Sequence, residues 1–288
     1  MAKHVEIFEE GPRDGLQNEA AGVATSDKIA LVDTLSEAGF ARIEVASFVS
    51  PKWVPQMADS VDVLGGVRRV SGVRYAALTP NMRGLWDALK AGADEGAIFG
   101  PASDGFSKTN INATIDESLA RFAPVIEAAG ANGVRVGGYV SCVVECPYDG
   151  KVAPAQVAQV AESLWQMGCY DISLGDTIGQ GTPEAVDAML AAVEEVVPTD
   201  RLAGHSHDTS GCALDNIEAA LARGVRVFDA AVGGLGGCPF APEAAGNVAT
   251  ERVNDRLRDL GYETGLDADV LARAAQMSRA LRGNQEAT

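Results

Sequence analysis

The sequence alternates strand-like and helix-like segments along almost its whole length, and this alternation limits the possible folds more than any other feature. Short runs rich in aliphatic and β-branched residues predict eight strands, at residues 5–9, 42–47, 73–79, 96–100, 134–143, 170–177, 202–209 and 225–232. Segments with apolar residues three or four positions apart lie between them and predict helices. Strict alternation favours a parallel sheet, and eight such units in 288 residues are typical of a closed (β/α)8 barrel, the TIM barrel.

Local signals predict where several of these helices begin and end. Ser26 can cap the helix that follows the first strand, and Gly39 is placed to end it. Thr114 and Glu117 have the spacing of a capping box at the start of a later helix. Pro124 lies inside that helix and is expected to kink or shorten it, because proline has no backbone N–H group.

An open, doubly wound sheet is the alternative to the barrel. It would place a glycine-rich phosphate loop after the first strand, whereas residues 11–15 read Gly-Pro-Arg-Asp-Gly and do not match that pattern. We therefore expect residues 1–288 to form a single barrel domain, with the last helices, after about residue 246, packing on the barrel. In such a barrel the active site lies at the C-terminal ends of the strands.

The charge and the cysteine pattern narrow the partners and the compartment. The formal net charge is −17, whereas nucleic acids and anionic membranes are bound by basic surfaces. No apolar run reaches the roughly 18 residues of a membrane span, and the strand-like sequence from Val5 leaves no room for a signal peptide. Five cysteines at irregular spacing are typical of free thiols. We expect a cytoplasmic protein that binds neither nucleic acid nor membrane.

Two of the three histidines in the chain, His205 and His207, lie in the seventh expected strand. Side chains two positions apart in a strand point to the same face, so the two imidazoles can share a divalent metal ion. A pair of polar residues that closes a strand would have the same spacing. The motif alone therefore leaves both interpretations open.

Other ionisable residues also fall at the ends of the expected strands. Arg13 and Asp14 follow the first strand, Glu44 lies in the second, and Asp176 ends the sixth. With the two histidines, they would gather several ionisable groups at one end of the barrel, which indicates a functional site. Taken singly, Glu44 or Asp176 could equally be a helix cap or part of a structural ion pair.

The segment after the eighth expected strand adds two more candidates. Residues 233–237 contain four glycines, and Cys238 follows them. Glycine permits tight turns and mobile loops, so this loop could present the Cys238 thiol at the active-site end of the barrel. Asn247 lies a little further on, and its amide oxygen could be a further metal ligand.

These motifs are similar to those of the 3-hydroxy-3-methylglutaryl-CoA lyases, within the pyruvate-carboxyltransferase-like (DRE-TIM) metallolyase superfamily. The similar stretches are residues 11–19, 47–57, 173–179, 204–209 and 234–239, and the resemblance extends from Val5 to about Gly265. It implies a retro-Claisen cleavage of 3-hydroxy-3-methylglutaryl-CoA to acetyl-CoA and acetoacetate, with Mg²⁺ or Mn²⁺ as the cofactor. It also implies an acyl-CoA as the binding partner and a homodimer as the assembly.

The resemblance implies roles for particular residues, in three groups. The implied metal ligands are Asp14, His205, His207 and Asn247. The implied catalytic residues are Arg13, Asp14, Glu44, Asp176, His205 and Cys238, of which Cys238 would protonate the enolate. The implied substrate contacts are Arg13, Gln17, Ser47, Lys52 and Asn110. Like Lys108 and Lys151, Lys52 lies in an expected loop, where it could meet the CoA phosphates or simply be solvated.

Other activities fit the same motifs. One is a lyase for a longer 3-hydroxy-3-alkylglutaryl-CoA, and another is a Claisen-condensing synthase of the same superfamily. Such synthases usually carry extra C-terminal segments, so a chain that stops soon after the eighth unit favours the lyase. A barrel without catalytic activity, acting as a binding or scaffold protein, is a further alternative, and the complete set of implied metal ligands disfavours it.

Overall fold

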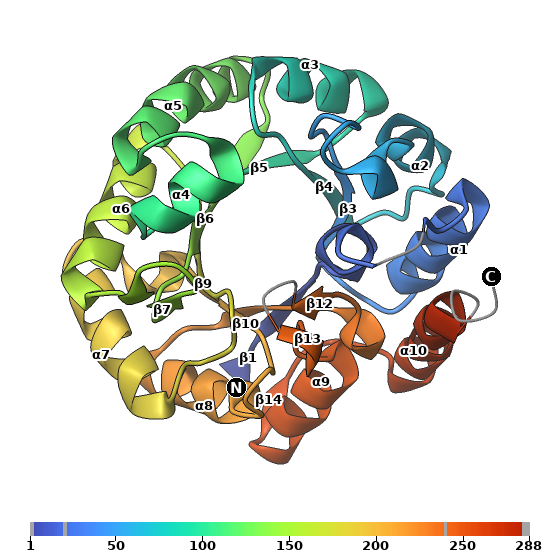
Figure 1. Ribbon diagram of the computed structural model, residues 1–288. Helices are drawn as coiled ribbons and strands as arrows, with labels where there is room; N and C mark the ends of the chain where they lie inside the picture. The colour runs from blue at the N-terminus through green and yellow to red at the C-terminus, as the bar shows by residue number, and fades with distance from the viewer. Residues whose placement is uncertain (1–2, 20–21, 239–240, 284–288) are drawn as a thin grey trace.

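The computed structural model describes residues 3–19, 22–238 and 241–283. Eight parallel strands in it form a closed barrel, in the order β10-β11-β2-β3-β4-β5-β6-β9 (Figure 1). They are β2 (Glu6–Glu9), β3 (Arg42–Ser47), β4 (Arg74–Leu78), β5 (Glu95–Pro101), β6 (Arg135–Ser141), β9 (Ile172–Asp176), β10 (Leu202–Ser206) and β11 (Val227–Ala230). Each lies inside an expected strand segment or exceeds it by one residue at either end. The predicted barrel is confirmed, and its closure rules out the open sheet.

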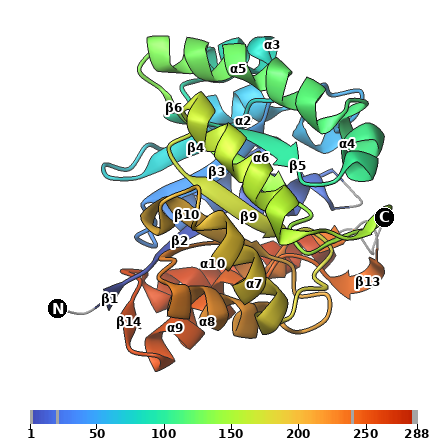
Figure 2. The same cartoon turned by 90° about the vertical axis from the view of Figure 1, so that its left-hand side faces the viewer.

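Helices cover the outside of the barrel (Figure 1). They are α1 (Thr25–Ser36), α2 (Ser60–Gly66), α3 (Met82–Ala91), α5 (Ile115–Ala131), α6 (Pro154–Met167), α7 (Pro183–Val193), α8 (Ala213–Arg223), α9 (Thr250–Asp259) and α10 (Ala268–Gly283). The shorter α4 (Asp104–Ile111) lies at the C-terminal end of the barrel strands, as Figure 2 shows. Across the described ranges, no helix is both long and apolar enough to cross a membrane.

The expected helix signals hold in some places and fail in others. Thr114 and Glu117 form the predicted capping box of α5. The Ser26 cap is wrong, because α1 begins one residue earlier, with Ala24 at the N-cap and no side-chain hydrogen bond there. Pro124 does not shorten α5, which continues to Ala131. Neighbouring side chains of α5, including Val125, are buried in the core, so packing against the barrel compensates for the hydrogen bond that proline cannot make.

A buried ionic network closes the N-terminal end of the barrel. Arg42 donates hydrogen bonds to Glu6 Oε1 at 2.6 Å and to Asp171 Oδ2 at 2.7 Å, and its guanidinium lies 4.4 Å from the centre of the Phe8 ring. Tyr170 donates to Glu95 Oε2 at 2.7 Å. These groups begin or precede strands, so the charges satisfy one another at the end opposite the candidate site.

The first described residues pair with a segment that precedes α10, on the outside of this closed end. The short strand β1 (Lys3–His4) pairs in parallel with β14 (Tyr262–Glu263), and Figure 2 shows the pair far from β13. The first barrel strand, β2, pairs with the last, β11, with Glu6 opposite Val227 and Glu9 opposite Ala230. Closing the barrel therefore joins segments separated by more than two hundred residues.

Candidate active site

A tight turn after β2 carries Arg13 and Asp14. This turn, η1 (Gly11–Gly15), is one turn of π-helix, in which the N–H groups of Arg13, Asp14 and Gly15 all donate to the carbonyl of Glu10, at 3.0, 2.8 and 3.3 Å. π-Helical turns are rare and often occur at functional sites. Here the turn brings two adjacent charged side chains together at the C-terminal end of the barrel.

Arg13 is held by two carboxylates. Its side chain is 7% exposed, and its Nε donates to Glu44 Oε2 at 2.5 Å while its Nη1 donates to Asp14 Oδ1 at 2.6 Å. A second guanidinium nitrogen also pairs with Glu44. Burial raises the pKa of Glu44 to about 8 even though Arg13 acts to lower it. Glu44 thus orients the guanidinium of Arg13, and its burial favours the protonated form of the carboxyl group.

The predicted metal ligands from the first and seventh strands lie together. Asp14, His205 and His207 each offer a ligand atom within 4.8 Å of the others, and the two imidazole centres are 5.4 Å apart. His207 Nδ1 is buried and has no hydrogen-bond partner among the described residues. Burial acts to raise the pKa of Asp14, but the charges of Arg13 and His205 outweigh it and lower the pKa to about 2. An ionised carboxylate and two imidazoles are a donor set that fits a divalent cation.

Asn247 joins this group from the other end of the chain. Its backbone forms a bridge with that of His207, and its Nδ2 donates to Asp14 Oδ2 at 2.8 Å and to the Leu235 carbonyl at 3.2 Å. In this arrangement the amide nitrogen faces Asp14. Rotation of the amide by half a turn would present the oxygen, which is the atom that binds a hard cation.

His205 meets two further carboxylates that sequence reasoning missed. Its Nδ1 lies 3.1 Å from Glu10 Oε2 and 3.6 Å from Asp229 Oδ2. Burial acts to lower the pKa of His205, but the nearby carboxylates of Asp229 and Glu10 outweigh it and raise the pKa well above its usual value. Tyr139 donates to the other oxygen of Glu10. The sequence signal that could have identified Glu10 and Asp229 was a charged residue within or directly after an otherwise apolar strand.

Glu9 is a third residue that sequence reasoning missed. Its carboxylate is completely buried. Oε1 accepts from the N–H groups of Gly11 at 2.9 Å and Val232 at 2.8 Å, and Oε2 accepts from the Thr250 hydroxyl at 2.7 Å. Burial nevertheless raises its pKa to about 8. Glu9 therefore links the turn that carries Asp14 to the loop after β11 and to the start of α9.

Asp176 is buried at the end of β9, where its described hydrogen bonds are with the following loop. It accepts from the N–H groups of Gln180 at 3.2 Å and Gly181 at 2.8 Å. Burial raises its pKa against these hydrogen bonds. The carboxylate thus holds a loop, which is neither the helix cap nor the ion pair that the sequence offered as its structural role. It lies close enough to His205 for the charge of that imidazole to act on the pKa of Asp176.

The expected substrate-binding residues divide into two groups. Ser47 Oγ and Gln17 Oε1 are buried and have no hydrogen-bond partner within the described part of the chain. Lys52 and Asn110 are exposed, in the loop after β3 and in α4. The Cys238 backbone belongs to β12 (Gly237–Cys238), which pairs with β13 (Ala241–Ala245), but its side chain lies outside the described part of the structure.

Comparisons with known proteins agree with this fold. The HMGL-like family model matches residues 4–277. A Pseudomonas aeruginosa relative, 3-hydroxy-3-isohexenylglutaryl-CoA/hydroxy-methylglutaryl-CoA lyase, is 56% identical over 283 residues, which cover 98% of this chain and 94% of the relative. The crystal structure of the HMG-CoA lyase from Brucella melitensis has a TM-score of 0.97 and 60% identity, and the match covers 98% of this chain and 100% of that one.

A further similar structure contains a ligand. It is an HMG-CoA lyase from Acinetobacter baumannii in complex with coenzyme A and 3-methylmalate, with a TM-score of 0.92 and 37% identity. The match covers 97% of this chain and 92% of that one. Because the family model spans nearly the whole sequence and the first relative exceeds half identity over almost its full length, the chain belongs to the HMGL-like family.

Proposed function

We propose that this protein is a metal-dependent carbon–carbon lyase that cleaves 3-hydroxy-3-methylglutaryl-CoA to acetyl-CoA and acetoacetate, with residues 1–288 as one catalytic domain. The convergence of Asp14, His205 and His207 within 4.8 Å, beside a buried arginine, carries the proposal. The family and the named activities of the P. aeruginosa and B. melitensis proteins support it.

The cation would be Mg²⁺ or Mn²⁺, held by Asp14, His205, His207 and the amide oxygen of Asn247. When bound, such a cation supplies a Lewis acid that lowers the pKa of the substrate's tertiary hydroxyl and orients it. Asp14 or His205, which lie together in this cluster, would take up the hydroxyl proton. Nδ1 of His207 is buried and has no hydrogen-bond partner among the described residues. This supports the assignment of His207 as a metal ligand, because a buried polar atom without a partner costs stability.

Arg13 would stabilise the negative charge that develops on the thioester oxygen as the carbon–carbon bond breaks. Its guanidinium is pre-oriented by Glu44 and Asp14 and still has N–H groups to direct at the substrate. Cys238 would then protonate the enolate carbon, since a thiol titrates near neutral pH. For Asp176 we propose an indirect catalytic role, in which it holds the loop after β9 and acts on His205 through its charge.

Substrate binding would involve two distinct surfaces. Ser47 and Gln17 carry buried polar atoms without described partners, so they are available to the polar part of the acyl group. Lys52 and Asn110 are exposed on segments that follow β3 and β5, and we assign them to the coenzyme A moiety. The coenzyme A bound to the A. baumannii homologue supports an acyl-CoA as the ligand class.

The test is acetoacetate release from 3-hydroxy-3-methylglutaryl-CoA by metal-free protein, with and without added Mg²⁺ or Mn²⁺. We expect no turnover after chelation and recovery with either metal. A His207→Ala variant is the matched control and should not recover. Full turnover by chelator-treated protein would refute the metal-dependent mechanism, and absence of acetoacetate under every condition would refute the lyase activity.

A second substrate is worth comparing, because the P. aeruginosa relative is named for an isohexenyl substrate as well as the methyl one. The ratio of kcat/KM for 3-hydroxy-3-isohexenylglutaryl-CoA and the methyl compound would decide the acyl preference. Faster net condensation than cleavage would instead favour a synthase. We also propose a homodimer in the cytoplasm, which light scattering and cell fractionation would test.

A further inference from the structure

His205 has two sides with different surroundings. One side faces Asp14 and His207, the candidate metal ligands. On the other side, Nδ1 lies 3.1 Å from Glu10 Oε2 and 3.6 Å from Asp229 Oδ2. The Glu10 and Asp229 residues are only 1% and 2% exposed. One ring nitrogen therefore lies beside two carboxylates that water barely reaches, and the other ring nitrogen remains for the metal site. Among the described residues, Nδ1 of His205 and Oε2 of Glu10 are both buried and neither makes a hydrogen bond of good geometry.

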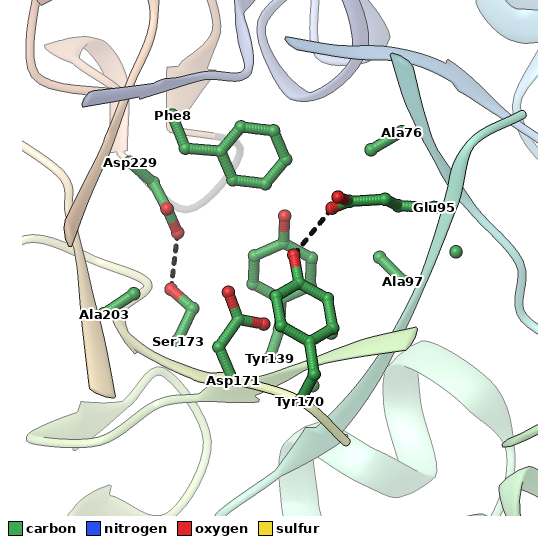
Figure 3. Close-up of a pocket in the computed structure, with 13 residues that line it drawn as sticks. Phe8, Ala76, Glu95, Ala97, Tyr139, Tyr170, Asp171, Ser173, Ala203 and Asp229 are labelled. Atoms are coloured by element: carbon green, nitrogen blue, oxygen red, sulfur yellow. Dashed lines mark hydrogen bonds between the residues drawn. The ribbon is translucent and has the colours of Figure 1, made fainter. Parts of the chain in front are cut away.

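Both carboxylates are themselves held in place. Tyr139, from β6, donates to Glu10 Oε1, and Ser173, from β9, donates to Asp229 Oδ2. Figure 3 shows the Ser173–Asp229 hydrogen bond and the Tyr139 ring at the edge of a cavity inside the barrel. The oxygens that face Nδ1 of His205 thus belong to two side chains with fixed orientations. Glu10 directly follows β2, and Asp229 lies in β11.

We propose that Glu10 and Asp229 are positioning residues that keep a proton on Nδ1 of His205, so that Nε2 presents its lone pair to the divalent cation. A neutral imidazole has one N–H group and one acceptor nitrogen, and an ionised carboxylate only accepts. Two carboxylates at Nδ1 therefore select the form that donates from Nδ1, which is the form that binds a metal through Nε2. This inference rests on the metal site of the proposed function, and it leaves Asp14 as the group that takes up the hydroxyl proton, because both nitrogens of His205 are then occupied.

The alternative role for these side chains is packing alone. Against it, two carboxylates buried side by side repel each other, and Asp14 adds further negative charge close to His205. An arrangement selected only for stability would avoid this repulsion. Glu10 also lies 3.9 Å from Arg13 Nη2, but the shorter contact is with His205. Nδ1 of His205 and Oε2 of Glu10, 3.1 Å apart, are both buried without a hydrogen-bond partner among the described residues. A small rotation that turns an Nδ1–H group toward Glu10 would satisfy both atoms, which packing alone does not explain.

The experiment compares Glu10→Gln, Asp229→Asn and the double variant with the wild type. Proteins labelled with ¹⁵N-histidine give ring-nitrogen chemical shifts that report where each proton lies, and with three histidines in the chain the spectrum can be assigned by single substitutions. The same proteins, free of metal, are titrated with Mn²⁺ and followed by electron paramagnetic resonance. Glu95→Gln is the control, because it neutralises another buried glutamate inside the barrel, at the end away from His205.

An amide at either position can donate to Nδ1 and so move the proton to Nε2. We expect each single variant to bind Mn²⁺ about tenfold more weakly, and the double variant to approach a hundredfold, the range for losing such outer contacts. In the double variant His205 Nδ1 should lack its proton, whereas Glu95→Gln should keep both the proton and the Mn²⁺ affinity. The Glu10 and Asp229 substitutions remove like charge from a crowded cluster, so these variants should fold, and circular dichroism checks the fold of every variant, including Glu95→Gln.

Two results would overturn the inference. One is a double variant that keeps the Nδ1 proton. The other is Mn²⁺ affinity within about threefold of wild type, well short of the expected loss. If the double variant does not fold, the single variants decide by the same criteria. Failure of the wild type to bind Mn²⁺ would refute the proposed metal site instead, and the nitrogen shifts would still show whether the carboxylates fix the His205 proton.

Discussion

Replacing Glu9 by glutamine should stabilise the protein at pH 8 and change its stability little at pH 5. The side chain is completely buried and makes three hydrogen bonds, with Gly11 N, Val232 N and Thr250 Oγ1. A glutamine has the same shape. Its amide oxygen can accept from both backbone N–H groups, and its NH₂ group can donate to the Thr250 hydroxyl. The substitution therefore removes the charge and keeps the contacts.

The magnitude follows from the shift in pKa. Burial raises the pKa of Glu9 from 4.5 to about 8, so the folded state holds a proton that the unfolded state releases. The stabilisation by this proton is complete below pH 4.5 and is lost as the pH rises to 8. Each pH unit in this window costs about 1.4 kcal/mol, which gives an upper limit of about 5 kcal/mol by pH 8. Glutamine does not titrate, so the variant escapes this loss.

Urea unfolding of both proteins at pH 5, 6, 7 and 8 measures the difference directly, since titration of all other groups cancels between them. The free-energy difference in favour of Glu9→Gln should grow steadily with pH. A Glu9→Leu variant is the control. It leaves the Gly11 and Val232 N–H groups unsatisfied and should lose about 1–3 kcal/mol for each at every pH. A difference between Glu9→Gln and wild type that stays flat from pH 5 to 8 would show that Glu9 is ionised when folded.

Three further predictions concern activity and stability. Arg13→Lys should lower kcat about a hundredfold or more with little change in KM. Lysine cannot reproduce the planar contacts with Glu44 that position the charge. Steady-state kinetics would measure this fall, and an unchanged kcat would contradict the assigned role of Arg13. Cys238→Ser should fold and bind metal but cleave substrate at least about a hundredfold more slowly, as single-turnover assays would reveal. Arg42→Met should cost about 3–5 kcal/mol of unfolding free energy, because it removes the cation that Glu6 and Asp171 share. The kcat of the folded Arg42→Met protein should stay near wild type, because Arg42 lies at the end of the barrel opposite the candidate active site.

The barrel was predictable because its signal is local and repeated. Each strand and helix shows its own apolar period, and strict alternation leaves few topologies. The candidate metal ligands were also accessible, since Asp14, His205 and His207 follow or end strands, where a barrel concentrates function. Short helices such as α2 and α4 were missed because a single turn or two contains too few residues to show a period.

Residues inside the barrel were harder to identify. Glu9, Glu10 and Asp229 lie within or next to short strands, and a buried carboxylate there has the same sequence pattern as an exposed one. Their meaning depends on partners far along the chain, such as Thr250 for Glu9. No local pattern encodes such pairings. Asp176 shows the same limit, since both its catalytic and its capping interpretations fitted the sequence.

During translation, β2 leaves the ribosome long before its barrel neighbour β11, because residues 6–9 pair with residues 227–230. At about 5–20 residues per second, β2 waits roughly 10–45 s for that partner. Asp14 waits longer for Asn247, with which it is hydrogen bonded. Open strand edges invite aggregation. A ribosome-stalled chain that ends before residue 227 is therefore expected to engage holdase chaperones, and a cation at the candidate metal site would assist only the last step of folding.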